Sequence, residues 1–169
     1  MSKEYFEENE KKDYELFEEL MMDIAPTLTI GATPKYHYCD ASAVTETNVI
    51  EYELKSRTYD FNETNRTIVD KNGKEYHEIF IEAQKATHLL FSHIHSNYTH
   101  LPKYVNFFET NGVKYAVCFD LLKMGLPEKK KYKIYSDGYE STEFGWRFLL
   151  PISKATIFKK DNNRYKRIQ

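Results

Sequence analysis

Two acids and a lysine alternate with apolar residues in the short segment 49–55 of this chain. Side chains alternate between the two faces of a strand, so Glu51, Glu53 and Lys55 share one face while the other face is apolar. Charged side chains are costly to bury unless they meet a compensating charge. Together with Asp40 upstream, these residue types suit a site for a divalent cation and a phosphate.

The chemistry that such a set supports is hydrolysis of a phosphodiester bond. That reaction needs a nucleophilic hydroxide and positive charge near the phosphate oxygens, and Mg²⁺ or Mn²⁺ held by oxygen ligands supplies both. We expect Asp40 and Glu53 to provide carboxylate ligands and the Leu54 carbonyl to provide a third. Lys55 is expected to orient the attacking water or to stabilise charge, and Glu51 to serve as an outer ligand.

The Glu-x-Lys triplet takes its meaning from its surroundings. The same triplet begins at Glu10 and at Glu128, but both of these lie in runs of charged residues that are typical of a solvated surface. Only Glu53-Leu54-Lys55 lies inside an apolar alternating segment with an aspartate shortly before it. The separation of thirteen positions between Asp40 and Glu53 suits two strands joined by a tight turn.

Two helices and several strands are expected to position these residues. The segment 5–24 predicts a helix, because apolar residues recur at helical spacing before Pro26. A second helix is expected to begin between residues 78 and 82 and to end near His95. The order helix, strands, helix, strands predicts an α/β or α+β fold. Strands are expected at 35–40 with a continuation to 44, and at 49–57, 67–69, 74–81, 104–108, 113–122, 131–135, 146–150 and 155–159, with a loop at 60–65.

Composition indicates one globular domain. The chain has 169 residues, of which 41% are apolar and 30% charged, and this length is enough for a substantial core. No apolar run approaches the ~20 residues that span a bilayer, and the acidic start lacks the apolar segment of a signal peptide, so we expect a cytoplasmic protein. Cys39 and Cys118 form no Cys-x-x-Cys pair, and His93 and His95 point apart on a helix, which disfavours a zinc centre.

Charge is distributed unevenly along the chain although the net charge is only −2. Nine acids lie within the first 24 residues, whereas twelve Lys or Arg face five acids from Leu122 onward. The cluster Lys129, Lys130 and Lys131 is a candidate surface for nucleic-acid phosphates, and a solvated basic tail is the alternative. Trp146 is expected to belong to the core rather than to stack on a base.

At this point the pattern resembles the PD-(D/E)xK nuclease superfamily, also called the restriction-endonuclease-like fold. Its core is helix, three strands, helix, strand, and its signature is an acid at a strand start followed by (D/E)-x-K on the next strand. Asp40 matches the first acid, and Glu53 and Lys55 match the second acid and the lysine. Members also carry an acid on the first helix, for which Glu18 and Glu19 are the candidates.

The resemblance covers about residues 14–122 and is closest to compact prokaryotic and phage-type members. Some members place a polar residue of the second helix at the site, which here implies Gln84 or Lys85. A Mg²⁺- or Mn²⁺-dependent nuclease acting on DNA, working as a homodimer, is what the resemblance implies. The chain then divides into a helix at 5–24, a nuclease-like core at 35–122 and a basic extension with additional strands at 123–169. It departs from the family in lacking a proline before Asp40 and in carrying an extra hairpin at 67–81.

Two other classes of function remain open from the sequence. One is a non-catalytic interaction module, in which Glu51, Glu53 and Lys55 form a surface ladder with neighbouring strands. The other is a phage-encoded inhibitor that mimics nucleic acid through an acidic first helix. The superfamily includes members that only bind, so the fold by itself does not establish catalysis.

Overall fold

The structure is a computed structural model that describes residues 3–34, 39–125, 127–136 and 139–169. Within these residues the fold is mixed α+β, with helices α1 (Lys3–Ile24) and α2 (Ala83–His95). Short 3-10 turns, η1 (Leu121–Lys123) and η2 (Ile152–Lys154), follow strands β9 and β11. The strands are β1 (Thr29–Ala32), β2 (Ala41–Val44), β3 (Val49–Ser56), β4 (Asp60–Asn62), β5 (Thr67–Val69), β6 (Glu75–Tyr76), β7 (Glu78–Glu82), β8 (His100–Thr110), β9 (Val113–Asp120), β10 (Glu128–Ser136), β11 (Tyr139–Pro151), β12 (Thr156–Asp161) and β13 (Arg164–Arg167).

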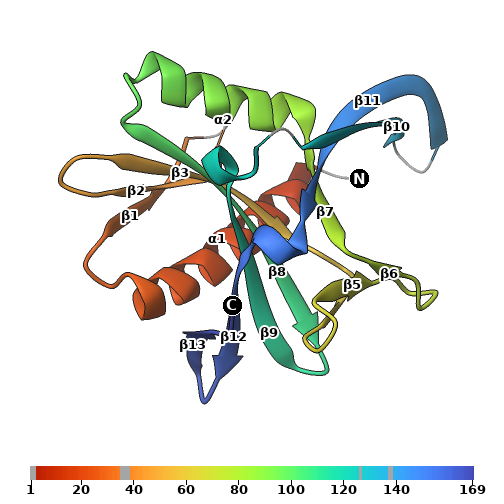
Figure 1. The fold of residues 1–169 in the computed structure, drawn as a ribbon, viewed down its shortest axis with the longest axis horizontal. Helices are drawn as coiled ribbons and strands as arrows, with labels where there is room; N and C mark the ends of the chain where they lie inside the picture. The colour runs from red at the N-terminus through yellow and green to blue at the C-terminus, as the bar shows by residue number, and fades with distance from the viewer. Residues whose placement is uncertain (1–2, 35–38, 126, 137–138) are drawn as a thin grey trace.

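The largest sheet of the described residues has the strand order β1-β2-β3-β8-β9-β12-β13 (Figure 1). Strands β1, β2 and β3 form an antiparallel meander, whereas β3 and β8 are parallel, from Val49 opposite His100 to Ser56 opposite Phe107. A parallel pair needs a long crossover, and here the crossover contains α2. The remaining neighbours, β8 through β13, are antiparallel.

Helix α1 covers one face of this sheet. Its residues Phe17, Leu20 and Met21 are buried because they follow one another at helical spacing. The ring of Phe17 lies 4.6 Å from that of Tyr52 on β3, measured between centroids. Small side chains on β2, such as Ala41, lie in the same apolar cluster and let the helix come close to the sheet.

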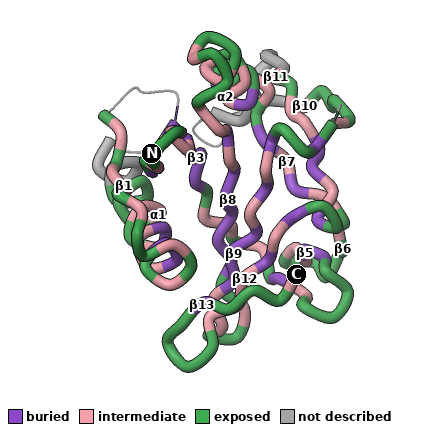
Figure 2. The backbone as a smooth tube through the Cα atoms, turned by 60° about the vertical axis from the view of Figure 1, so that its left-hand side comes forward, coloured by how far each residue is buried: buried purple, intermediate pink, exposed green. Residues whose placement is uncertain are grey.

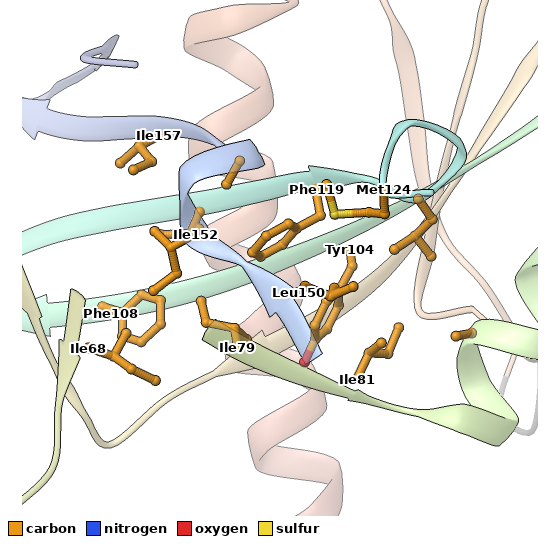
Figure 3. Packing of buried hydrophobic residues seen from close by; sticks show 14 of the residues in the cluster. Ile68, Ile79, Ile81, Tyr104, Phe108, Phe119, Met124, Leu150, Ile152 and Ile157 are labelled. Atoms are coloured by element: carbon orange, nitrogen blue, oxygen red, sulfur yellow. The ribbon is translucent and has the colours of Figure 1, made fainter. Parts of the chain in front are cut away.

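The opposite face of the sheet is covered by α2 and by a second sheet of order β10-β11-β7. Ile79 and Ile81 of β7 and Leu150 of β11 belong to one apolar cluster with Phe108 and Phe119 of the large sheet (Figure 3). Buried residues follow β3, β8 and β9 through the centre of the molecule, while the outer turns of both helices are exposed (Figure 2). The large sheet is therefore packed on both faces.

The additional C-terminal strands expected at 123–169 pair with both sheets. Strand β11 pairs with β7, and β12 pairs with β9 within the large sheet, whose edge strand on this side is β13. The expected helices and the hairpins across Asn72-Gly73 and Asn111-Gly112 are confirmed. The loop expected at 60–65 is wrong at its start, since β4 pairs with β5, and β1 and β13 were not expected.

The strand expected at 35–40 falls mostly on residues 35–38, which lie outside the described residues. Cys39 and Asp40 form a bend directly before β2. No helix in the described part of the chain combines the length and the apolar character needed to cross a bilayer.

Candidate functional site

Strand β3 carries two buried acids on the face that α2 covers. Glu51 is 3% exposed and Glu53 is 8% exposed, whereas Tyr52 and Leu54 point to the opposite face and pack beneath α1. This alternation is the one that the sequence pattern predicts. The acids of β3 therefore lie inside the protein, where each needs a compensating partner.

One edge of β3 is completed by carboxylates instead of by a strand. Pairing of β2 with β3 begins with Ala41 opposite Tyr52, so β3 continues beyond the start of β2. There the Leu54 N–H donates to Asp40 Oδ2 at 2.8 Å, and the Ser56 N–H donates to Asp13 Oδ1 at 3.1 Å. The N–H and C=O of one strand residue point to the same side, so the Leu54 carbonyl is directed to this edge as well.

Three charged side chains, from β3, from α2 and from the bend before β2, converge at this edge. Lys85, in the first turn of α2, places Nζ 2.8 Å from Glu53 Oε1 and 2.9 Å from Glu53 Oε2. The same Nζ lies 4.0 Å from Asp40 Oδ1. The side chains of Lys85 and Asp40 are 38% and 32% exposed, so the cluster opens to solvent while Glu53 forms its floor.

The cluster holds more negative than positive charge. Burial raises the pKa of Glu53 to about 8, and the neighbouring charge of Asp40 adds to this effect while Lys85 opposes it. Burial alone would lower the pKa of Lys85, but the carboxylates of Glu53 and Asp40 outweigh it, so the pKa is raised and Lys85 stays protonated. With all three groups ionised the net charge is −1, which a proton or a further cation relieves.

Asp13 extends the site on the side of α1. Burial raises the pKa of its carboxyl group, against the hydrogen bond from Ser56 and the charge of Lys55. The sequence suggested Glu18 or Glu19 as the acid of this helix. Glu19 instead pairs with Lys114 and Lys160, at 3.1 Å and 3.0 Å, and Glu18 lies beside Tyr14.

Helical phase is the signal that identifies Asp13. It precedes the buried Phe17 by four residues and Met21 by eight, so it continues the stripe of α1 that faces the sheet. Glu18 and Glu19 lie off that stripe. An acid in line with buried apolar residues is therefore a better candidate than one flanking them.

Lys55 is not the lysine that pairs with Glu53 in this structure. It lies on the same face of β3 as Glu53 but is exposed, and none of the ion pairs among the described residues includes it. Lys85 is the ammonium at the carboxylates, and Gln84 beside it is exposed. The second helix thus contributes the lysine in contact with Glu53, while the lysine of the strand is exposed and its charge acts on Asp13.

Glu51 belongs to a separate polar group beneath the end of α2. Its Oε1 lies 2.8 Å from His100 Nδ1 and accepts a hydrogen bond from Ser92 Oγ at 3.1 Å. His93 contacts the backbone carbonyl of His100. Glu51 therefore interacts with His100 at the start of β8, two residues along β3 from Glu53.

The thiol beside Asp40 does not act as a nucleophile in this setting. Cys39 is buried, and burial together with the charges of Glu51 and Asp40 raises the pKa of its thiol to about 12. A thiolate is the reactive form of cysteine, and this environment suppresses it.

The basic surface expected at Lys129, Lys130 and Lys131 lies on β10, where all three residues are exposed. Lys129 Nζ lies 4.4 Å from the ring centroid of Trp146, across the hairpin. Trp146 is 46% exposed, so the expectation that it belongs to the core is wrong. The β10–β11 hairpin projects beside the start of α2, where Lys85 lies (Figure 1).

Comparison with known proteins gives no family model, no curated protein and no solved structure that matches this chain. In the part of the chain that is described, no three His, Cys, Asp or Glu side chains gather in a way that would hold a metal ion by themselves. Asp40 and Glu53 are the two carboxylates that contact Lys85 in this cluster.

Proposed function

We propose that this protein hydrolyses phosphodiester bonds of nucleic acid, with DNA as the substrate, at the cluster of Asp40, Glu53 and Lys85. The observation that carries the proposal is the convergence of two carboxylates on one cationic group at an open strand edge. Burying like charges together is unfavourable unless a cation is bound between them. Their arrangement therefore favours a role in binding positive charge over a role in stability.

The donor set fits Mg²⁺ or Mn²⁺. Asp40 and Glu53 would hold the ion through carboxylate oxygens, and the Leu54 carbonyl, directed to the same edge, would add a third oxygen. The ammonium group of Lys85 already lies next to both carboxylates, which supports the proposal that this position accommodates a positive charge. Mg²⁺ keeps several of its water ligands when it binds to a protein, so a small number of protein ligands is sufficient. When bound, the ion supplies a hydroxide nucleophile and neutralises charge on the phosphate.

The lysines of the site have distinct roles in this proposal. Lys85 is protonated, and with a metal ion held at Glu53 its Nζ would donate hydrogen bonds to a phosphate oxygen. Lys55 is exposed on the same face, so its Nζ can orient the attacking water from the solvent side. Asp13 lies beside the edge and adds negative charge that attracts the cation.

The element order supports a restriction-endonuclease-like core. Helix α1, strands β1 to β3, helix α2 and strand β8 follow one another in the order that the resemblance implies, with β4 to β7 inserted before α2. Asp40 precedes β2 and Glu53 lies on β3, as the signature requires. Cutting both strands of DNA needs two such sites, so we infer a homodimer, which sedimentation equilibrium would detect.

A non-catalytic module is the alternative function. It places Glu51, Glu53 and Lys55 in a ladder on the surface, and the burial of both glutamates beneath α2 argues against that arrangement. An inhibitor that mimics nucleic acid needs a continuous acidic helix, whereas Glu19 of α1 is neutralised by two lysines.

A cleavage assay tests the proposal. Plasmid and labelled oligonucleotides are incubated with the protein in Mg²⁺, Mn²⁺ or EDTA, and Glu53→Gln is compared with Lys71→Ala, a substitution in an exposed turn. We expect cleavage in either metal, none in EDTA, none with Glu53→Gln and full activity with Lys71→Ala. Activity that persists in Glu53→Gln, or absence of cleavage with any metal, rejects the proposal.

A further inference from the structure

Two arginines from distant parts of the chain meet at one phenyl ring. Arg57, directly after β3, places its guanidinium carbon 4.5 Å from the ring centroid of Phe80 on β7. Arg147, on β11, places its own guanidinium carbon 4.6 Å from the same centroid. Like charges repel, so two guanidinium groups that share one ring create a position of high positive potential.

Neither arginine is neutralised by an acid among the described residues. Arg57 donates to Asn106 Oδ1 and to the Phe80 carbonyl, both at 2.8 Å, and also contacts the Tyr104 hydroxyl, and all three partners are neutral. Glu82 is the cross-strand neighbour of Arg147, yet no ion pair joins them. A partly buried arginine is usually compensated by a salt bridge to a carboxylate. The absence of such a carboxylate in the described part of the chain leaves the positive charge of both guanidinium groups available to an anionic ligand.

The guanidinium of Arg147 is held by rings rather than by hydrogen bonds. Its carbon lies 5.2 Å from the centroid of Tyr132, in addition to its contact with Phe80. Its Nε is buried and has no hydrogen-bond partner among the described residues. A buried donor without a partner costs free energy. The guanidinium is therefore oriented by packing against the rings and not by hydrogen bonds.

Gly145 makes the contact between Tyr132 and Arg147 possible. A Cβ at this position would lie 2.7 Å from Tyr132 Cε1, a distance that side chains do not adopt. The ring of Tyr132 therefore lies across Gly145, its cross-strand partner, where any larger residue would displace it. The glycine and the two rings together fix the direction of the Arg147 fork.

The arginine pair is continuous with the catalytic face of β3. Glu53, Lys55 and Arg57 follow one another at two-residue spacing, so their side chains share one side of the strand. At ~3.3 Å per residue, Arg57 lies about 13 Å along the strand from Glu53. The Arg57 side chain reaches the hydroxyl group of Tyr104, the residue opposite Glu53 on β8, so the arginine pair borders the carboxylate site.

We propose that Arg57 and Arg147, with Phe80 between them, form a clamp for the phosphodiester backbone of the nucleic-acid strand, separate from the carboxylate site. The clamp rests on the proposed function for its choice of ligand. An Arg fork matches phosphate geometry with two parallel hydrogen bonds, which suits a backbone contact without base preference. Arg147 supplies this fork, because Arg57 already donates its hydrogen bonds within the protein and adds positive charge beside it. Lys130 lies opposite Arg147 on β10, where it pairs with Glu128 at 3.4 Å.

Binding without metal tests the clamp independently of cleavage. The affinity for a fluorescein-labelled single strand of about 12 nucleotides, a length within the usual site sizes, is measured by polarisation in EDTA across a salt series. Arg147→Gln is compared with Arg164→Gln, a matched change at an exposed arginine of β13. Arg147 is chosen over Arg57, whose three hydrogen bonds make a folding defect more serious.

We expect Arg147→Gln to weaken binding about tenfold at low salt. The slope of log affinity against log salt should decrease in magnitude by about 0.7, the value for one phosphate contact on a single strand. Arg147→Lys keeps the charge and loses the fork, so it should keep the slope and recover only part of the affinity. Thermal unfolding of each variant establishes that it folds.

Two outcomes overturn the clamp. One is binding by Arg147→Gln with the affinity and salt slope of Arg164→Gln. The other is competition by inorganic pyrophosphate at concentrations well below those of the oligonucleotide, which would assign the arginines to a small phosphate compound. If binding depends on Arg147 while no metal supports cleavage, the clamp stands and the hydrolase proposal fails, so the two results are separable.

Discussion

Lys85 Nζ lies 2.8 Å from Glu53 Oε1 although 32 residues separate them in the chain. Between them the chain leaves the large sheet, forms β4 to β7 and returns through the first turn of α2. The ion pair therefore joins the crossover helix to the strand that it covers. It places a cationic group where the exposed lysine of the same strand, Lys55, does not reach.

The first prediction separates these two lysines. Lys85→Ala leaves Glu53 without its cationic partner, and we expect the free energy of unfolding to decrease by about 1–2 kcal/mol. This loss is smaller than for a fully buried pair, because the Lys85 side chain is 38% exposed. Lys55→Ala, at an exposed position, should change stability by less than about 0.5 kcal/mol. Both should reduce cleavage at least about 100-fold. Chemical denaturation and initial cleavage rates measure these effects, and equal stability losses would contradict the assigned positions.

The second prediction concerns stability against pH in metal-free buffer. The pKa of Glu53 is raised from 4.5 to about 8 in the folded protein, so the folded state holds a proton that the unfolded state releases. The stabilisation is complete below pH 4.5 and is lost as pH rises through 8. We expect the free energy of unfolding to fall by on the order of 2 kcal/mol relative to Glu53→Gln, which mimics the protonated form.

Urea unfolding of both proteins between pH 5 and about pH 9 gives this difference directly. Histidines and other groups titrate in the same range, but they are common to the two proteins and cancel in the comparison. Parallel curves for the wild-type protein and Glu53→Gln would show that the carboxyl group titrates normally.

The third prediction concerns metal binding measured by calorimetry. Mn²⁺ competes with the proton on Glu53, so its affinity should rise with pH until about 8 and then level off. Asp40→Asn and Glu53→Gln should each weaken binding at least about tenfold. Lys85→Ala should bind Mn²⁺ more tightly while cleaving less, because the competing ammonium is gone. Unchanged affinity in all three variants would exclude this metal site.

The fourth prediction tests the thiols. Burial raises the pKa of both Cys39 and Cys118 to about 12, so a thiol reagent at pH 8 should react with neither until the protein unfolds. Cys39→Ala should keep full cleavage activity, since the thiol lies in the apolar cluster and is held in its unreactive form. Rapid labelling of the native protein, or loss of activity in Cys39→Ala, would place the thiol in the chemistry.

Local structure could be predicted where one physical requirement dominates. The alternation of Ile50, Tyr52 and Leu54 with charged residues determines which face of β3 packs against α1, because a pleated strand has only two faces. The turns at Asn72-Gly73 and Asn111-Gly112 could be placed because glycine adopts positive φ at little cost, here +78° and +77°. Strands such as β1 and β13 are short and lack any such marker.

The assignment of side chains to the site depends on long-range packing. The triplet drew attention to Lys55, yet the end of β3 is open and Lys55 faces solvent, while the crossover brings Lys85 onto Glu53. Asp13 enters the site because α1 packs along the same strand edge that Asp40 completes. Trp146 is half-exposed because it lies toward the projecting end of the β10–β11 hairpin, past the β7 pairing.

The sequence alone determined that Glu51 and Glu53 share one face of β3 opposite an apolar face, because they are two residues apart, and that two helices flank this strand. Only the tertiary structure decided which cations meet those acids and which arginines meet at Phe80. The physical reason is that alternation and helical phase act within one segment, whereas ion pairs and ring contacts depend on how a crossover and a hairpin return to the sheet. Those contacts join residues such as Arg57 and Arg147 that no local pattern relates.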